Sequence, residues 1–216
     1  MGMRKTALLL ASVAIAVLLA SGVALGVTSS KQRSGHPIEP EWMDEPVAAQ
    51  GGSLQASLFA GHWTSVTPEE RLYYYNPEKV YPTAVAHGAG AWNALHKRFN
   101  YKGVRLIRVF SKANATVRID GIRDCSDRSW FAFAQNLVGA PDRLGVNTCA
   151  LNRQSAKLRQ HVLTHELGHH LGSGHQRMSL CGKSIMLSSV PCGRKRIVLT
   201  KPGVRDVTWY QNRWVR

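Results

Sequence analysis

Acidic residues are scarce in this sequence, because 13 Asp and Glu stand against 28 Lys and Arg, which gives a formal net charge of +15. A surface with this balance attracts anionic polymers or membranes, which concerns partners and not the fold. Internal repeats and heptad runs are absent, and only one long apolar stretch occurs. These absences exclude collagen-like, coiled-coil and polytopic membrane proteins. What remains is a chain of 216 residues with 44% hydrophobic side chains, enough for one globular domain with its own core.

The long apolar stretch spans residues 6–27, which carry no charge and follow the basic pair Arg4-Lys5. Two interpretations are open. Residues 1–26 can be a signal peptide, because small residues near Gly22 or Gly26 suit a cleavage site. Alternatively, residues 6–27 are an uncleaved membrane anchor, since a helix that rises roughly 1.5 Å per residue just spans a bilayer core over this length. Under both interpretations the rest of the chain is expected to be secreted or extracytoplasmic, with membrane contact only through residues 6–27 if they are retained.

Cysteine is missing from the first 124 residues, so acylation at an N-terminal lipobox is excluded. Four cysteines follow, at Cys125, Cys149, Cys181 and Cys192. In an oxidising compartment an even number of cysteines indicates disulfides, and four cysteines allow three connectivities. We favour Cys125–Cys149 and Cys181–Cys192 because these pairs close the shorter loops, and spacing alone leaves the other pairings open.

Composition also divides the chain after its apolar stretch. Residues 27–55 are rich in Ser, Gly, Pro and charge, which predicts a linker or a short pro-segment with little order. Residues 56–216 are expected to form one folded domain, with order beginning near Leu58.

Strands and helices alternate in the domain that the sequence predicts. The aromatic-rich residues 71–75 end at Asn76-Pro77 and indicate a first strand. Apolar residues at helical spacing predict a helix over 84–99 that is capped by Thr83, and a second helix that runs from a cap at Asn152 to about Leu171. The other expected elements are strands at 104–110, 115–122 and 145–151, a loop at 123–144 with a short ordered piece at 130–134, and a last helix at 203–213. This order predicts an α+β domain around a single mixed sheet.

The most informative segment is His165-Glu166-Leu167-Gly168-His169-His170-Leu171-Gly172-Ser173-Gly174-His175, which fits H-E-x-x-H-x-x-G-x-x-H at every fixed position. Residues i and i+4 of a helix share a face, so His165 and His169 present two imidazoles about one turn apart. Gly172 is expected to end the helix in a left-handed conformation, so that the chain folds back and delivers His175 as a third ligand. Three protein ligands and one open position indicate a catalytic zinc and not a structural one.

Glu166 stands next to the first ligand, where its carboxylate can reach a water on the metal. There it can act as a general base and then as a general acid toward the leaving amine. The zinc would polarise the scissile carbonyl and stabilise the oxyanion. The expected reaction is therefore the hydrolysis of peptide bonds, with a protein or peptide as the substrate.

These residues make the sequence resemble the metzincin clan of zinc endopeptidases over roughly residues 58–216, and it is most similar to matrixin-like bacterial members. The second hallmark of the clan is a Met-turn beneath the zinc, which Ser184-Ile185-Met186 matches here, with Met186 eleven residues after His175. The aromatic first strand, the Trp92-Asn93 helix and a closing Asp206…Tyr210 helix fit the same pattern. The resemblance implies a zincin-like single domain, in which a twisted mixed sheet carries an active-site helix and a C-terminal helix.

Some features of the relatives are missing. Astacin- and serralysin-type members carry a Tyr two residues after the turn Met, and because Ser188 occupies that position here, no such tyrosine is assigned. The snapalysin type uses Asp as the third ligand, whereas this chain has His175. Matrixins often bind calcium and a second zinc, but no comparable Asp-rich loop is visible. We therefore expect one catalytic Zn²⁺ and find no sequence support for calcium.

Three further residues near the motif have simpler interpretations. His161 lies one turn before His165 and is interpreted as a neutral histidine at the surface or behind the ligands. His170 points off the metal face and is expected to be structural. Cys192 lies in Pro191-Cys192-Gly193, which superficially resembles the zinc-capping cysteine motif of matrixin propeptides, but it follows the catalytic motif and is better explained as half of a disulfide.

A basic run, Arg194-Lys195-Arg196, follows the Met-turn and continues with Lys201, Arg205, Arg213 and Arg216. A solvated basic face is its default interpretation. We also hypothesise that it favours acidic substrates or an anionic cell-envelope surface, because relatives build a wall of the substrate cleft in this part of the chain.

Two other functions compete with the peptidase. An exported basic binding module with a degraded zinc site would have no need of Glu166. A bacterial family of endoribonucleases also spaces three histidines as H-x3-H-x5-H, and the net charge of +15 would suit RNA. That family does not place a Glu directly after the first ligand, and both the export segment and Met186 argue against it. No specific nucleic-acid partner is therefore expected.

Overall fold

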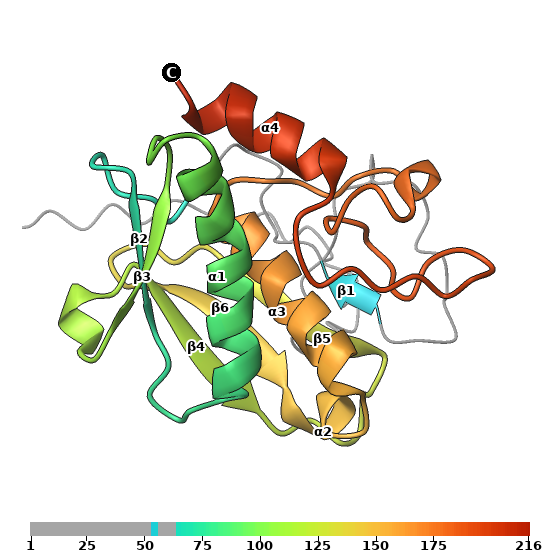
Figure 1. Ribbon diagram of the computed structural model, residues 1–216. Helices are drawn as coiled ribbons and strands as arrows, with labels where there is room; N and C mark the ends of the chain where they lie inside the picture. The colour runs from blue at the N-terminus through green and yellow to red at the C-terminus, as the bar shows by residue number, and fades with distance from the viewer. Residues whose placement is uncertain (1–52, 56–63) are drawn as a thin grey trace, which may run out of the picture. The chain divides into compact units, whose positions relative to one another are not determined.

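The computed structural model describes residues 53–55 and 64–216, all of which belong to one compact unit (Figure 1). The predicted signal peptide or anchor at 6–27, most of the predicted linker at 27–55 and the expected start of order at Leu58 lie outside the described residues. Among the helices that are described, none is long and apolar enough to cross a membrane.

A six-stranded mixed sheet forms the centre of this unit, which confirms the α+β class with a mixed sheet. Its strands lie in the order β1-β5-β6-β4-β2-β3. Only the β5–β6 pair is antiparallel, and the other neighbours run parallel. The strand bounds are β1 Ser53–Gln55, β2 Arg71–Tyr75, β3 Arg105–Val109, β4 Val117–Ile122, β5 Trp130–Gln135 and β6 Asp142–Asn147.

The strand predictions were right where local patterning is strong and wrong where a turn intervenes. Alternation of buried and half-buried residues along β2 confirms the first strand. Within the loop predicted at 123–144, the short ordered piece expected at 130–134 is the strand β5, whereas the start of β6 was not predicted. The strand predicted at 145–151 was also wrong in its second half, because the Asn147 side chain accepts hydrogen bonds from the backbone N–H groups of Cys149 and Ala150 and turns the chain into a helix.

Two long helices, α1 and α3, lie side by side against the sheet, in green and orange in Figure 1. The Trp92 indole of α1 donates a 2.8 Å hydrogen bond to the backbone carbonyl of Thr164 in α3. Gly88 and Ala89 also face inward on α1, so the two helix backbones approach closely. This contact holds the helix that carries the motif. The helices span α1 Pro82–Arg98, α2 Thr148–Leu151, α3 Ala156–His170 and α4 Val204–Trp214, with short 3-10 turns at Lys112–Asn114 and Met178–Leu180.

Both predicted helix caps were wrong. α1 begins at Pro82, because the ring of proline fixes φ at a value that suits the first position of a helix. Thr83 therefore already lies inside the helix. α3 is capped by Ser155, whose hydroxyl accepts the N–H of Leu158 at 3.2 Å. Asn152 instead ends α2, so the chain makes two helical segments where the sequence predicted a strand and one helix.

The outer edge of the sheet at β3 is closed by a side chain. The Asn93 amide of α1 donates to the carbonyl of Leu106 at 2.9 Å and accepts the N–H of the same residue at 2.8 Å. A single side chain thereby occupies both backbone groups through which Leu106 could bond to another strand.

Two disulfides hold the segments around the sheet and the motif helix. Cys125, which follows β4, is bonded to Cys149 in α2, and Cys181 is bonded to Cys192. These are the two pairings that close the shorter loops. Among the described residues no cysteine is free, which fits an extracytoplasmic protein.

The α1–α3 approach makes a testable distinction between two glycines of α1. A Cβ at Gly88 would lie 3.0 Å from the Thr164 hydroxyl and 3.2 Å from its backbone, whereas a Cβ at Gly90 would meet nothing within 4 Å. Gly90→Ala should gain up to about 1 kcal/mol of stability from helix propensity. Gly88→Ala should be less stable than Gly90→Ala by about 1–3 kcal/mol, because α1 and α3 must separate. Urea unfolding of the two variants tests this, and equal midpoints would contradict it.

Candidate metal centre

Three histidines of the motif converge on one point. α3 supplies His165 and His169 one turn apart, and Gly172, with φ of 90°, ends the helix in the left-handed conformation expected of it. The chain then returns and brings His175 to the other two. The Nε2 atoms form a triangle, with 3.0 Å between His165 and His169, 3.2 Å between His165 and His175, and 3.3 Å between His169 and His175. Within the described chain this is the group of side chains that could hold a metal ion.

The hydrogen bonds of the Nδ1 atoms determine the tautomer of two of these rings. The Nδ1 atom of His165 lies 2.8 Å from the carbonyl oxygen of Ile185, and that of His169 lies 2.7 Å from the carbonyl oxygen of Ser173. Each Nδ1 must carry the proton in order to donate to a carbonyl, so each Nε2 carries a lone pair. Two lone pairs at 3.0 Å repel unless a cation lies between them.

The triangle has the dimensions of one face of a metal-centred tetrahedron. Nitrogens bound at about 2.0–2.1 Å in tetrahedral geometry stand about 3.3–3.4 Å apart, and the observed separations are close to this. Burial lowers the pKa of His165 and His175 well below the usual histidine value, with the neighbouring histidines adding to the effect, and burial lowers the pKa of His169 to about 4. The neutral form that binds metal is therefore favoured. The residues fit a metal ion, and imidazole ligands suit zinc, copper, iron and nickel alike.

Glu166 lies on α3 directly after the first ligand and is fully buried. Neither of its carboxylate oxygens has a hydrogen-bond partner among the described residues. Burial raises the pKa of this carboxyl well above its usual range. A buried carboxyl with no partner is costly for the fold, and such groups are found where chemistry needs them.

Met186 packs against α3 at Gly168, next to His169 in the sequence. A Cβ on Gly168 would come within 2.4 Å of the Met186 sulfur and 2.9 Å of the Trp92 ring, so Gly is required for this contact. The Met186 segment is fixed by Asp206 at the start of α4, which accepts hydrogen bonds from the Ser184 hydroxyl at 2.5 Å and from the Ile185 N–H at 2.7 Å. The position that holds Ser188 is half-buried.

His161 was interpreted as a neutral histidine either at the surface or behind the ligands, and the first alternative was wrong. The side chain is buried, its Nδ1 donates to the Leu199 carbonyl at 2.7 Å, and its ring lies 6.3 Å from the His165 ring. Burial lowers its pKa to about 4. His161 therefore supports the first ligand from behind as a neutral group.

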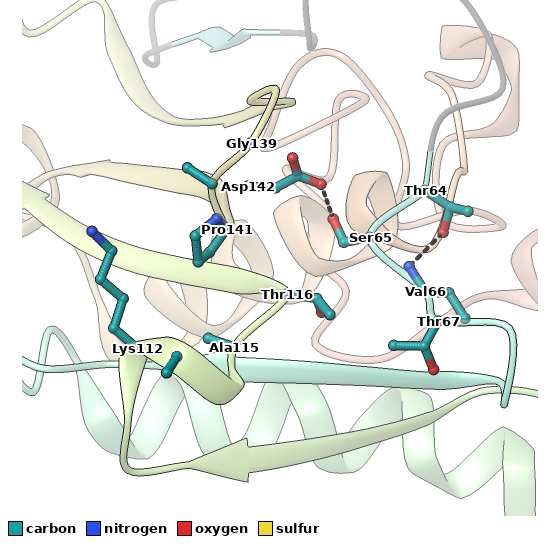
Figure 2. Close-up of a pocket in the computed structure, with 12 residues that line it drawn as sticks. Thr64, Ser65, Val66, Thr67, Lys112, Ala115, Thr116, Gly139, Pro141 and Asp142 are labelled. Atoms are coloured by element: carbon teal, nitrogen blue, oxygen red, sulfur yellow. Dashed lines mark hydrogen bonds between the residues drawn. The ribbon is translucent and has the colours of Figure 1, made fainter. Parts of the chain in front are cut away.

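A second polar group, which sequence reasoning missed, holds the far end of α3. The Ser65 hydroxyl donates to the Asp142 carboxylate at 2.6 Å (Figure 2). The same hydroxyl lies 2.8 Å from the Nδ1 of His170. The backbone of Ser65 also donates to the His170 carbonyl. These bonds tie the segment before β2 to the start of β6 and the end of α3. The sequence predicted only that His170 is a structural residue off the metal face.

A cavity with a large volume lies away from the triad. It has a volume of about 790 Å³ and lies between the segment before β2, the β3–β4 connection and the β5–β6 turn, as the residues in Figure 2 show. No ligand histidine lines it. The chemistry of the three histidines and Glu166, and not cavity size, therefore identifies the candidate site.

Comparisons with known proteins add little at the level of sequence. No protein-family model matches the chain, and no curated protein matches it. Among solved structures, the crystal structure of myroilysin overlaps with a TM-score of 0.45 at 11% sequence identity, over 76% of this chain and 92% of that chain. An overlap of this quality carries no argument about activity, so the function has to be argued from the site.

Removing one ligand tests the triad directly. His175→Ala should weaken zinc affinity by about 10²-fold or more, because even groups that only support a ligand are worth 10- to 100-fold. His87→Ala, at an exposed position on α1, is the matched control and should bind one zinc per chain like the wild type. Chelator competition with elemental analysis measures both variants. Unchanged affinity in His175→Ala would remove His175 from the site.

Burial of His161 predicts a specific pH dependence. Its pKa is about 4 in the folded protein against an ordinary value of 6.5, so below pH 6.5 the unfolded chain binds a proton that the folded protein excludes. Stability is thus complete above pH 6.5 and is lost as the pH falls toward 4. In metal-free protein, His161→Asn should abolish about 2 kcal/mol of the wild-type loss between pH 7 and pH 5. Parallel urea-unfolding profiles for the two proteins would contradict this assignment.

Proposed function

We propose that this chain is an exported zinc-dependent endopeptidase with a zincin-like domain, similar to the metzincin clan and to its matrixin-like members. One observation carries the proposal: three histidine Nε2 atoms lie 3.0–3.3 Å apart, and the residue after the first of these histidines is a fully buried glutamate that has no hydrogen-bond partner among the described residues. A structural metal site is closed by four ligands and has no use for such a carboxyl, whereas a hydrolytic site needs three ligands and a base.

His165, His169 and His175 would hold the zinc through Nε2. The backbone carbonyls of Ile185 and Ser173 fix two of these rings in the tautomer that binds metal. When bound, zinc supplies Lewis-acid polarisation of a peptide carbonyl and makes water a nucleophile near neutral pH.

Glu166 would move the proton. Its carboxylate takes a proton from the attacking water and then delivers it to the leaving amine, as a general base followed by a general acid. Burial raises the pKa of this carboxyl well above its usual range, so it can keep the proton between the two steps. With a cation held by the three histidines, the Glu166 carboxyl would be able to ionise before the reaction.

The substrate of the proposed enzyme is a protein or peptide. From Arg143 to Arg216 the only carboxylate side chains are Glu166 and Asp206, and both are buried. The surface of this C-terminal part of the chain is therefore cationic, which supports the proposal that acidic substrates or an anionic cell-envelope surface are favoured. The two disulfides support a secreted or extracytoplasmic location.

Substitution of the general base tests the proposal. The zinc-loaded wild type should cleave unfolded protein, and Glu166→Gln, which keeps the size of the side chain, should lose about 10²-fold or more of kcat with an unchanged zinc content. An RNA substrate assayed in parallel is the control for a nuclease. If the wild type with one zinc per chain leaves protein intact, the peptidase assignment fails. RNA cleavage that survives Glu166→Gln would indicate a nuclease instead.

A further inference from the structure

A smaller cavity lies beside the candidate metal centre. It has a volume of about 310 Å³, within the range of pockets that take small ligands or side chains. Its walls combine apolar side chains with three polar residues, which are Gln154 and Ser155 just before α3 and Arg196 on the chain after Met186. The lining residues that matter for the argument are Phe131, Ser155, Leu158, Val190, Val198 and Arg196.

The cavity is on the metal-binding face of α3. Leu158 precedes His165 by two helical turns, which places the cavity about 10 Å from the first ligand along the helix axis. His161 fills the turn between them, with its ring against His165 and its Nδ1 on the Leu199 carbonyl. Leu199 directly follows Val198, which lines the cavity. The chain segment that binds His161 therefore also forms part of the cavity wall.

Arg196 supplies a cation at this cavity. It lies in a tight hairpin whose base pairs Cys192 with Ile197 through two backbone hydrogen bonds, and the Cys181–Cys192 disulfide anchors that base. The Arg196 side chain is exposed and has no ion pair within residues 64–216. Ser155 caps α3 at the cavity, so the positive end of the helix dipole faces the same space.

We propose that this cavity receives an acidic side chain of the substrate, preferably glutamate, and that Arg196 is the residue that determines this specificity. The aliphatic stem of the glutamate packs against Leu158, Val190 and Val198, and its carboxylate pairs with the Arg196 guanidinium. The inference rests on the proposed peptidase function. An extended peptide advances about 3.3–3.6 Å per residue, so the acidic residue lies within about three positions of the cleaved bond.

Two readouts test the proposal. A peptide mixture cleaved by the zinc-loaded wild type first shows the position at which glutamate is selected. Pairs of peptides that differ only by Glu or Gln at that position are then titrated into zinc-loaded Glu166→Gln protein, and binding is followed by fluorescence anisotropy. If cleavage shows no selected position, such pairs are made for each of the three positions on either side of the central bond. The second readout needs no turnover.

Arg196→Glu and Arg194→Glu form a matched pair. Both change the net charge equally and both residues are exposed in the same hairpin, but Arg194 does not line the cavity. With Arg196 in place, the Glu166→Gln protein should bind the Glu peptide about threefold or more tightly than the Gln peptide, as expected for a partly exposed ion pair. Arg196→Glu should abolish or reverse this preference, and Arg194→Glu should retain it.

The possible results separate the two proposals. No preference for glutamate, or an equal loss in both arginine variants, overturns the role of Arg196 and leaves the peptidase assignment intact. Absence of cleavage by the wild type, together with Arg196-dependent binding of the Glu peptide, overturns the peptidase assignment and leaves the cavity as an acidic side-chain site.

Discussion

The candidate centre depends on a buried carboxylate that is not part of it. Asp206, at the start of α4, accepts hydrogen bonds from the Ser184 hydroxyl and from the N–H groups of Ile185 and Gly203. Burial raises the pKa of Asp206, and these three hydrogen bonds act in the opposite direction. A carboxylate inside a protein is tolerated only with such donors. They hold Ile185 where its carbonyl meets His165, and thus join two segments that lie twenty residues apart.

Local rules were enough to find the ligands and the turn that follows them. The i, i+4 spacing of His165 and His169 needs only helix geometry, and Gly172 is the residue that can adopt the left-handed conformation at the helix end. The two disulfides followed from loop length once export was assumed. The strand at 71–75 and the buried face of α1 followed from periodicity, because each has one side on the core.

Tertiary contacts decided what the sequence could not show. Residues 161–170 of α3 are buried on every side, because α1, strand β5 and the chain from Ile185 to Leu199 all contact the helix, so it has no polar stripe. The buried position of His161 depends on its hydrogen bond to Leu199, which lies 38 residues away in the sequence. Ser65 meets His170 across more than a hundred residues, and no local pattern marks either residue for the other. The predicted helix caps were wrong because Ser, Thr and Asn residues close together in the sequence all satisfy the capping rule, so the rule does not select one of them.

The hydrogen bonds of Asn93 have a consequence for the behaviour of the protein in concentrated solution. An outer strand with unpaired backbone groups is a template on which other chains assemble into aggregates. At β3 the Asn93 amide already occupies both groups of Leu106, and the exposed Arg105 and Arg108 on either side would bring like charges together if two copies met there. The high positive charge, taken above as a property that attracts partners, therefore also keeps this edge from self-association.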